Sequence, residues 1–93
     1  MDKKEKFKMY VKVCERAEKM DINYNDRMTM MMDIEAADNI FNMRLEDWLN
    51  ADDFNFAHDI IGIRDNIKRE KYPETEFRNF VPRFSGNWNL YKI

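Results

Sequence analysis

The sequence predicts an all-α fold, with three main helices, a short helix and an extended aromatic C-terminal tail packed on the bundle. The first glycine is Gly62 and the first proline is Pro73, so the chain lacks the two strongest helix interrupters over its first 61 residues. Apolar residues recur at spacings of three and four in three long segments before Pro73, and lose that period after it. We therefore expect one domain over 1–93, divided into a helical core (1–72) and an aromatic tail (73–93).

The first helix is predicted over about residues 3–20. Its apolar stripe recurs at helical spacing and consists of Phe7, Tyr10, Val11, Cys14 and Ala17. Short polar residues follow, and Asn25 or Asp26 is expected to cap the next helix, because such side chains accept hydrogen bonds from the first free N–H groups.

The second helix is predicted over about 27–43, with its stripe formed by Met30, Ile34, Ala37 and Phe41. A compact apolar triplet, Leu45, Trp48 and Leu49, indicates a short helix after it. The third main helix is predicted over about 53–70, with a stripe of Phe56, Ile60, Ile63 and Ile67. Gly62 inside this helix costs about 1 kcal/mol relative to alanine, so either a neighbour packs closely there or the helix bends.

The composition indicates a folded chain in a reducing compartment. Hydrophobic residues make up 44% of it and the formal net charge is only −2, which excludes a disordered polyelectrolyte. Cys14 is the single cysteine, so an intramolecular disulfide is impossible. The charged N-terminus does not resemble a secretory leader, and the longest apolar run, Met30 to Met32, is far too short for a membrane span. We expect a cytoplasmic protein that does not bind a membrane.

Charge is distributed unevenly along the chain. Residues 1–20 carry a net charge of +3, residues 21–65 carry −8 and residues 66–93 carry +3. The basic ends, which include Lys3, Lys4, Lys6, Lys8, Lys12, Arg78 and Arg83, leave a nucleic-acid-binding accessory protein as one alternative. The acidic middle disfavours nucleic acid and instead suits a basic protein surface.

Most enzyme classes lack their signatures in this sequence. One cysteine and one histidine, Cys14 and His58, supply neither a zinc site nor a nucleophile with its base. Two glycines cannot form a phosphate-binding loop, and no cofactor is expected. One enzymatic alternative stays open, a Mg²⁺-dependent nucleoside triphosphate pyrophosphohydrolase. It would use two carboxylate pairs at i, i+3 on facing helices: Glu15, Glu18, Glu35 and Asp38.

The string Asp52-Asp53-Phe54-Asn55-Phe56-Ala57-His58-Asp59, followed later by Pro82-Arg83-Phe84, resembles a group of small uncharacterised bacteriophage and prophage proteins. The resemblance covers about residues 28–86 and implies a phage accessory product that acts in the host cytoplasm; it assigns no catalytic residue. Core packing does not explain the polar members of this string. We expect them to form either a buried network or a binding site, and both possibilities stay open: Asp52, Asp53, Asn55, His58 and Asp59, with Arg83 as a partner.

The function that these observations favour is non-enzymatic. We expect a phage accessory protein that binds and modulates a host protein, conceivably a defence component. The hydrolase and the nucleic-acid-binding protein are the alternatives.

Overall fold

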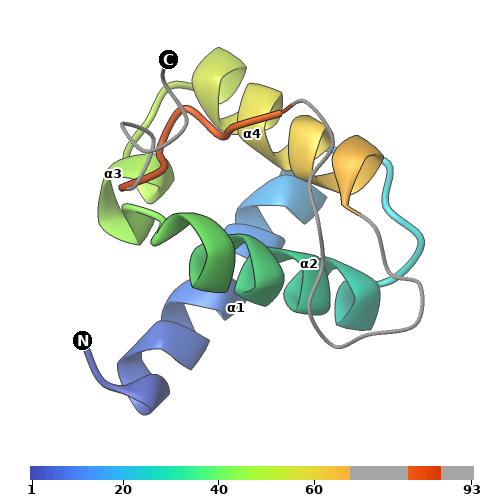
Figure 1. Cartoon of the computed structure of the whole chain (residues 1–93). Coiled ribbons are helices and arrows are strands. Elements are labelled where there is room, and N and C mark those ends of the chain that lie inside the picture. The colour runs from blue at the N-terminus through green and yellow to red at the C-terminus, as the bar shows by residue number, and fades with distance from the viewer. Residues whose placement is uncertain (68–79, 87–93) are drawn as a thin grey trace.

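Four helices make up the fold in the computed structural model, which describes residues 1–67 and 80–86 (Figure 1). They are α1 (Lys3–Lys19), α2 (Arg27–Phe41), the short α3 (Leu45–Leu49) and α4 (Asp53–Asn66). No strand occurs within the described ranges, which confirms the predicted all-α class with three main helices and a short one. None of the helices in this part of the chain is long and apolar enough to cross a membrane.

Acidic residues begin the first two helices. The carboxylate of Asp2 accepts the backbone N–H of Glu5 at 2.8 Å at the start of α1, and that of Asp26 accepts the N–H of Thr29 at 2.7 Å at the start of α2. The sequence left Asn25 and Asp26 as the candidates for the second cap, and the structure selects Asp26.

Two helices are shorter than the sequence predicted. α2 ends at Phe41 rather than residue 43, because Asn42 adopts a left-handed conformation (φ 49°) and its N–H closes on the carbonyl of Asp38 at 2.8 Å. α4 ends at Asn66 rather than residue 70, because Ile67 turns to extended backbone. The side chain of Asn66 also donates to the carbonyl of Gly62 at 2.8 Å, a local bond that competes with helix continuation.

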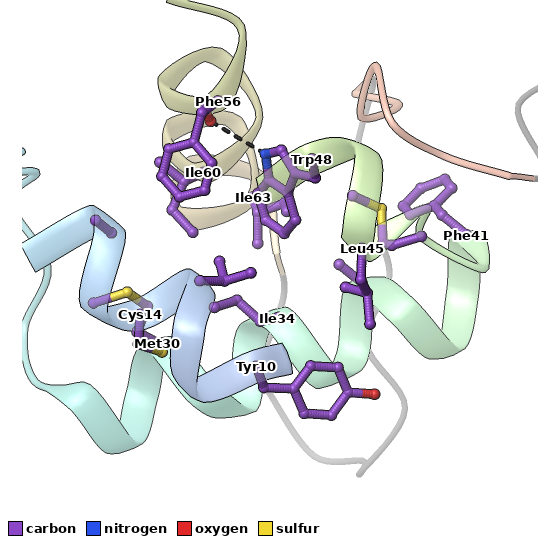
Figure 2. Packing of buried hydrophobic residues seen from close by; sticks show 14 residues of the cluster. Tyr10, Cys14, Met30, Ile34, Phe41, Leu45, Trp48, Phe56, Ile60 and Ile63 are labelled. Atoms are coloured by element: carbon purple, nitrogen blue, oxygen red, sulfur yellow. Dashed lines mark hydrogen bonds between the residues drawn. The ribbon is translucent and has the colours of Figure 1, made fainter. Parts of the chain in front are cut away.

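The core lies where α1 and α2 pack together and where α3 and α4 close over them. Figure 2 shows the Trp48 ring at its centre, tilted against Phe56 with ring centroids 5.3 Å apart, and its indole N–H directed at the Phe56 carbonyl at 3.4 Å. The predicted stripe of the second helix is buried as expected, and so is that of the third except for Ile67, which follows the end of α4 and is only partly buried. The buried members are Met30, Ile34, Ala37 and Phe41 of α2, and Phe56, Ile60 and Ile63 of α4.

The stripe predicted for the first helix is partly wrong. Tyr10, Cys14 and Ala17 are buried, but Phe7 is 59% exposed and Val13 takes a core position instead. The buried face of α1 is therefore rotated away from Phe7, because this helix packs against α3 as well as α2.

Part of the predicted aromatic tail is described, and it packs on the bundle as expected. The segment 80–86, orange-red in Figure 1, runs between α4 and α3. The ring of Phe80 lies against Gly62, where an added methyl group would overlap the ring. This contact decides between the two explanations for the mid-helix glycine in favour of close packing. Residues 68–79 and 87–93 of the predicted core and tail lie outside the described residues.

Candidate functional site

A buried carboxylate on α4 holds the segment 80–86 in place. The side chain of Asp59 is fully buried, and its two oxygens accept the backbone N–H groups of Arg83 at 2.8 Å and Phe84 at 3.0 Å. The Nδ1 atom of His58 lies 3.0 Å from the same carboxylate. A buried carboxylate is costly unless it is hydrogen-bonded, so these bonds explain how Asp59 is tolerated in the core. Asp59 therefore positions the backbone of the segment 80–86.

The other end of the segment is attached to the α2–α3 connection. An antiparallel bridge pairs Met43 with Ser85: the N–H of Arg44 donates to the Phe84 carbonyl at 2.7 Å, and the N–H of Gly86 donates to the Asn42 carbonyl at 2.9 Å. A methyl group on Gly86 would overlap that Asn42 carbonyl. The backbone at position 86 can therefore approach the Asn42 carbonyl this closely only with glycine at that position.

Three exposed apolar side chains belong to α4 and to the segment 80–86. Phe54 is 70% exposed, and Ile61 and Val81 are 38% and 36% exposed. The Arg83 guanidinium lies 5.4 Å from the Phe54 ring centroid and donates to the Oδ1 atom of Asn55. We call this surface the α4 face: Phe54, Asn55, His58, Ile61, Val81 and Arg83. Phe54, His58 and Ile61 share one side of α4, because they are four and three residues apart.

Four exposed carboxylates lie on α3 and around the start of α4, and two of them form ion pairs within the chain, Asp47 with Arg44 and Asp53 with Arg16. We call them the acidic corner: Glu46, Asp47, Asp52 and Asp53. Asp52 is the residue before α4, but its side chain makes no capping bond there. It accepts the Asn55 amide at 2.5 Å, and that bond holds the pKa of Asp52 below its usual range.

Arg16 connects α1 to this corner from the side of the core. Its guanidinium donates to the carbonyls of Leu49 at 2.8 Å and Ala51 at 2.7 Å, at the end of α3, and to the carboxylate of Asp53 at 3.0 Å. The same group stacks 4.5 Å from the centroid of the Phe56 ring. Arg16 thus fixes α3 and the start of α4 relative to α1.

The six predicted site residues are thus divided among three environments. Asn55, Arg83 and Asp52 form a connected surface group, while Asp59, beside the half-buried His58, belongs to a buried network. Asp53 pairs instead with Arg16. The buried network has a structural counterpart at Asp59, while a ligand-binding role for these residues stays a prediction.

The carboxylates of the hydrolase alternative are not assembled into a metal site. Within residues 1–67 and 80–86, no three His, Cys, Asp or Glu side chains converge as a metal ion would require. Glu18 forms an ion pair with Arg27, and Asp38 is buried, where it accepts the Tyr10 hydroxyl at 2.5 Å and the Lys6 ammonium at 3.3 Å. The described structure therefore gives this alternative no support.

Two further ionisable groups stay protonated at neutral pH because they are buried. Burial raises the pKa of the Cys14 thiol to about 11, so the thiol is protonated and weakly nucleophilic at neutral pH. Burial, then the hydrogen bond to Asp38, raises the pKa of the Tyr10 hydroxyl well above its usual range. Of the basic residues considered for nucleic acid, Lys3, Lys4, Lys8 and Lys12 are exposed, Lys6 pairs with Asp38, and Arg78 lies outside the described residues.

Sequence reasoning missed the roles of Arg16 and Phe54 and the buried state of Asp33 and Asp38. One signal for Phe54 was available: it stands two residues before Phe56, which already belongs to the core stripe, and so falls on another side of the helix. The two α2 carboxylates gave no comparable signal. Their partners, Tyr24 and Tyr10, lie in other elements of the chain.

The family comparison covers nearly all of the described structure, since residues 5–86 match the family of unknown function DUF6874. The chain belongs to this family. The match includes α1 as well as the Asp59 attachment and the segment 80–86, and so it extends well before residue 28, where the resemblance noted from the sequence begins. No curated protein and no solved structure matches the chain.

Proposed function

We propose that this DUF6874 protein is a non-enzymatic phage accessory protein that binds a host protein through the α4 face and modulates its activity. The observation that carries the proposal is the exposed Phe54 ring beside the Arg83 guanidinium. Aromatic residues and arginine are enriched in protein interfaces, and a few of them usually supply most of the binding free energy. The phage origin and the host cytoplasm rest on the resemblance of the Asp52–Asp59 string.

Preorganisation of the surface supports this proposal. Arg83 and Val81 lie on a segment that two attachments hold, the Asp59 carboxylate on one side and the Met43–Ser85 bridge on the other. A surface that is ordered before binding loses less conformational entropy when a partner docks. Loops on a rigid scaffold commonly carry binding residues for this reason.

The chemistry of the α4 face defines the partner. It should offer an apolar pocket for Phe54, and a carboxylate or carbonyl oxygen for the remaining donors of Arg83. The acidic corner reaches this contact at Asp52, which accepts the Asn55 amide of the α4 face, so the partner should carry lysine or arginine at that rim. Charge at an exposed rim mainly accelerates association and is screened by salt.

The test is affinity capture from a lysate of the host, with the tagged wild-type chain and matched variants at low and moderate salt. Phe54→Ser and Arg83→Gln change the α4 face, while Met28→Ser removes an equally exposed apolar side chain from α2. Circular dichroism establishes that each variant is folded. We expect a stoichiometric host protein that Phe54→Ser and Arg83→Gln retain at least about tenfold more weakly, and that Met28→Ser retains like wild type.

Capture that is equal for all four proteins would contradict the proposal, and so would the absence of any stoichiometric protein. A captured protein that only Met28→Ser loses would place the contact on α2 and would equally contradict it. Loss of capture at moderate salt would show that the acidic corner contributes.

A further inference from the structure

Arg83 is an exposed arginine whose main chain and side chain are both held by other parts of the fold. Its backbone N–H donates to the buried Asp59 carboxylate at 2.8 Å, and its carbonyl accepts the guanidinium of Arg44 at 3.1 Å. Its own guanidinium donates through Nη1 to the Asn55 side chain and lies 5.4 Å from the Phe54 ring centroid. An exposed arginine ordinarily samples many rotamers, which a ligand must restrict on binding. At Arg83 the fold restricts the side chain before any ligand arrives.

Two members of the acidic corner orient the groups that hold Arg83. The Asn55 amide nitrogen donates to Asp52 at 2.5 Å, so the amide oxygen is the atom that accepts the Arg83 guanidinium. Arg44 holds the Arg83 carbonyl with one terminal nitrogen and donates with the other to Asp47 at 3.3 Å. Both carboxylates therefore help to fix the position of one exposed cation.

Part of the Arg83 guanidinium stays open to a ligand. It donates through Nη1 to Asn55, and in the part of the chain that the structure describes no carboxylate pairs with it. A guanidinium carries five N–H donors in a planar fork, and two parallel donors match the two oxygens of one carboxylate. Arginine therefore binds a carboxylate at two points, where lysine offers only a point charge.

We propose that the Arg83 guanidinium binds a carboxylate of the partner at two points, beside the apolar pocket that receives Phe54. This inference rests on the proposed function and narrows it, because the α4 face then requires an acidic group and not merely a hydrogen-bond acceptor. A carbonyl oxygen would use only part of the fork. A phosphate group carries more negative charge and is repelled more strongly by Asp52, which is bonded to the same Asn55 amide. The partner then presents an acidic group to Arg83 and a basic one to Asp52.

The carboxylate can belong to an aspartate or glutamate side chain or to the C-terminus of a chain, and the test separates the two sources. It is a titration of the purified, isotope-labelled full chain, followed at the Nε–H signal of Arg83 by nuclear magnetic resonance. The peptide acetyl-Leu-Glu-Leu-amide offers a side-chain carboxylate, and acetyl-Leu-Gln-Leu offers a terminal one. Acetyl-Leu-Gln-Leu-amide has neither and is the matched neutral peptide.

The Arg83 signal should move with one or both carboxylate peptides, with a dissociation constant of about 1–10 mM for a single two-point contact, and stay in place with the neutral peptide. The Nε–H signal of Arg64 already donates to Asp65 at 2.8 Å, so it is the internal control and should not move. Asn55→Ala removes an acceptor that fixes the guanidinium and should raise the dissociation constant about threefold or more. Arg83→Lys keeps the charge but lacks the fork, and should show no saturable binding.

The inference is overturned if neither carboxylate peptide moves the Arg83 signal, if the neutral peptide moves it equally, or if Arg83→Lys binds like wild type. A response to only one carboxylate peptide supports the inference and names the source. Failure of the proposed function is distinguishable, because it is read in the lysate as the absence of a captured host protein. Saturable carboxylate binding at Arg83 without such a protein would refute the host partner and leave the carboxylate site established.

Discussion

Replacing Asp59 by alanine should detach the segment 80–86 from α4. The substitution removes the acceptor of two backbone N–H groups, those of Arg83 and Phe84, at 2.8 and 3.0 Å. A hydrogen bond to a charged group contributes about 1.5–3 kcal/mol to stability. Both donors are only partly buried, so we take the lower value for each and expect the free energy of unfolding to fall by about 3 kcal/mol. A domain of this size has only about 5–15 kcal/mol in total.

The amide variant tests whether both oxygens are needed. Asp59→Asn keeps the shape of the side chain and one acceptor oxygen, but places an NH₂ group against the second backbone N–H. It should therefore cost about half as much as Asp59→Ala, roughly 1.5 kcal/mol. Asp65→Asn is the matched control, because this carboxylate lies on the same helix but is exposed, in an ion pair with Arg64. We expect the control to be within about 0.5 kcal/mol of wild type.

Urea unfolding followed by far-ultraviolet circular dichroism measures all three variants. A loss of under about 1 kcal/mol for Asp59→Ala would refute the conclusion that this carboxylate holds the segment. Equal losses for Asp59→Asn and the Asp65 control would refute the requirement for two acceptors.

Three other substitutions test further contacts and burial in the structure. Arg16→Ala removes two hydrogen bonds to backbone carbonyls at the end of α3 and the stacking on Phe56. It should lower the free energy of unfolding, measured in urea, by about 2–3 kcal/mol. A change under about 0.5 kcal/mol would contradict this. Gly62→Ala should lower the thermal midpoint, although alanine favours helices, because its methyl group overlaps the Phe80 ring; a raised midpoint would contradict this contact. Burial raises the pKa of the Cys14 thiol from 9.0 to about 11, so the unfolded chain loses this proton first as pH rises. Stability from Cys14 should be complete below pH 9 and fall by about 2–3 kcal/mol by pH 11. Cys14→Ala should make that fall shallower in urea unfolding at a series of pH values, and an unchanged slope would contradict the assignment.

Helix periodicity was sufficient to predict most of the fold. The stripes of α2 and α4 are buried because tertiary packing uses the same side of each helix that the apolar spacing marks. α1 departs from its predicted stripe because it packs against both α2 and α3, and these contacts are distant in sequence. The ends of α2 and α4 depend on the left-handed Asn42 and the extended Ile67, conformations that spacing does not specify.

The candidate site was only partly predictable for a similar reason. The excess of polar residues between Asp52 and Asp59 marked the correct region, and Arg83 does contact Asn55 there. Which carboxylate would be buried depends on the path of the segment 80–86, which brings two backbone N–H groups to Asp59 and none to the exposed Asp52. The exposed Phe54 became part of a surface only once Arg83 was placed beside it.

The docking of the segment 80–86 on α4 creates the proposed binding surface, and native-state amide hydrogen exchange tests that docking most directly. The backbone N–H groups of Arg83 and Phe84 donate to the buried Asp59 carboxylate and should exchange slowly, with protection close to that of the core amides of α4. Exchange at these two amides as fast as in an unstructured peptide, while the α4 amides stay protected, would contradict the account.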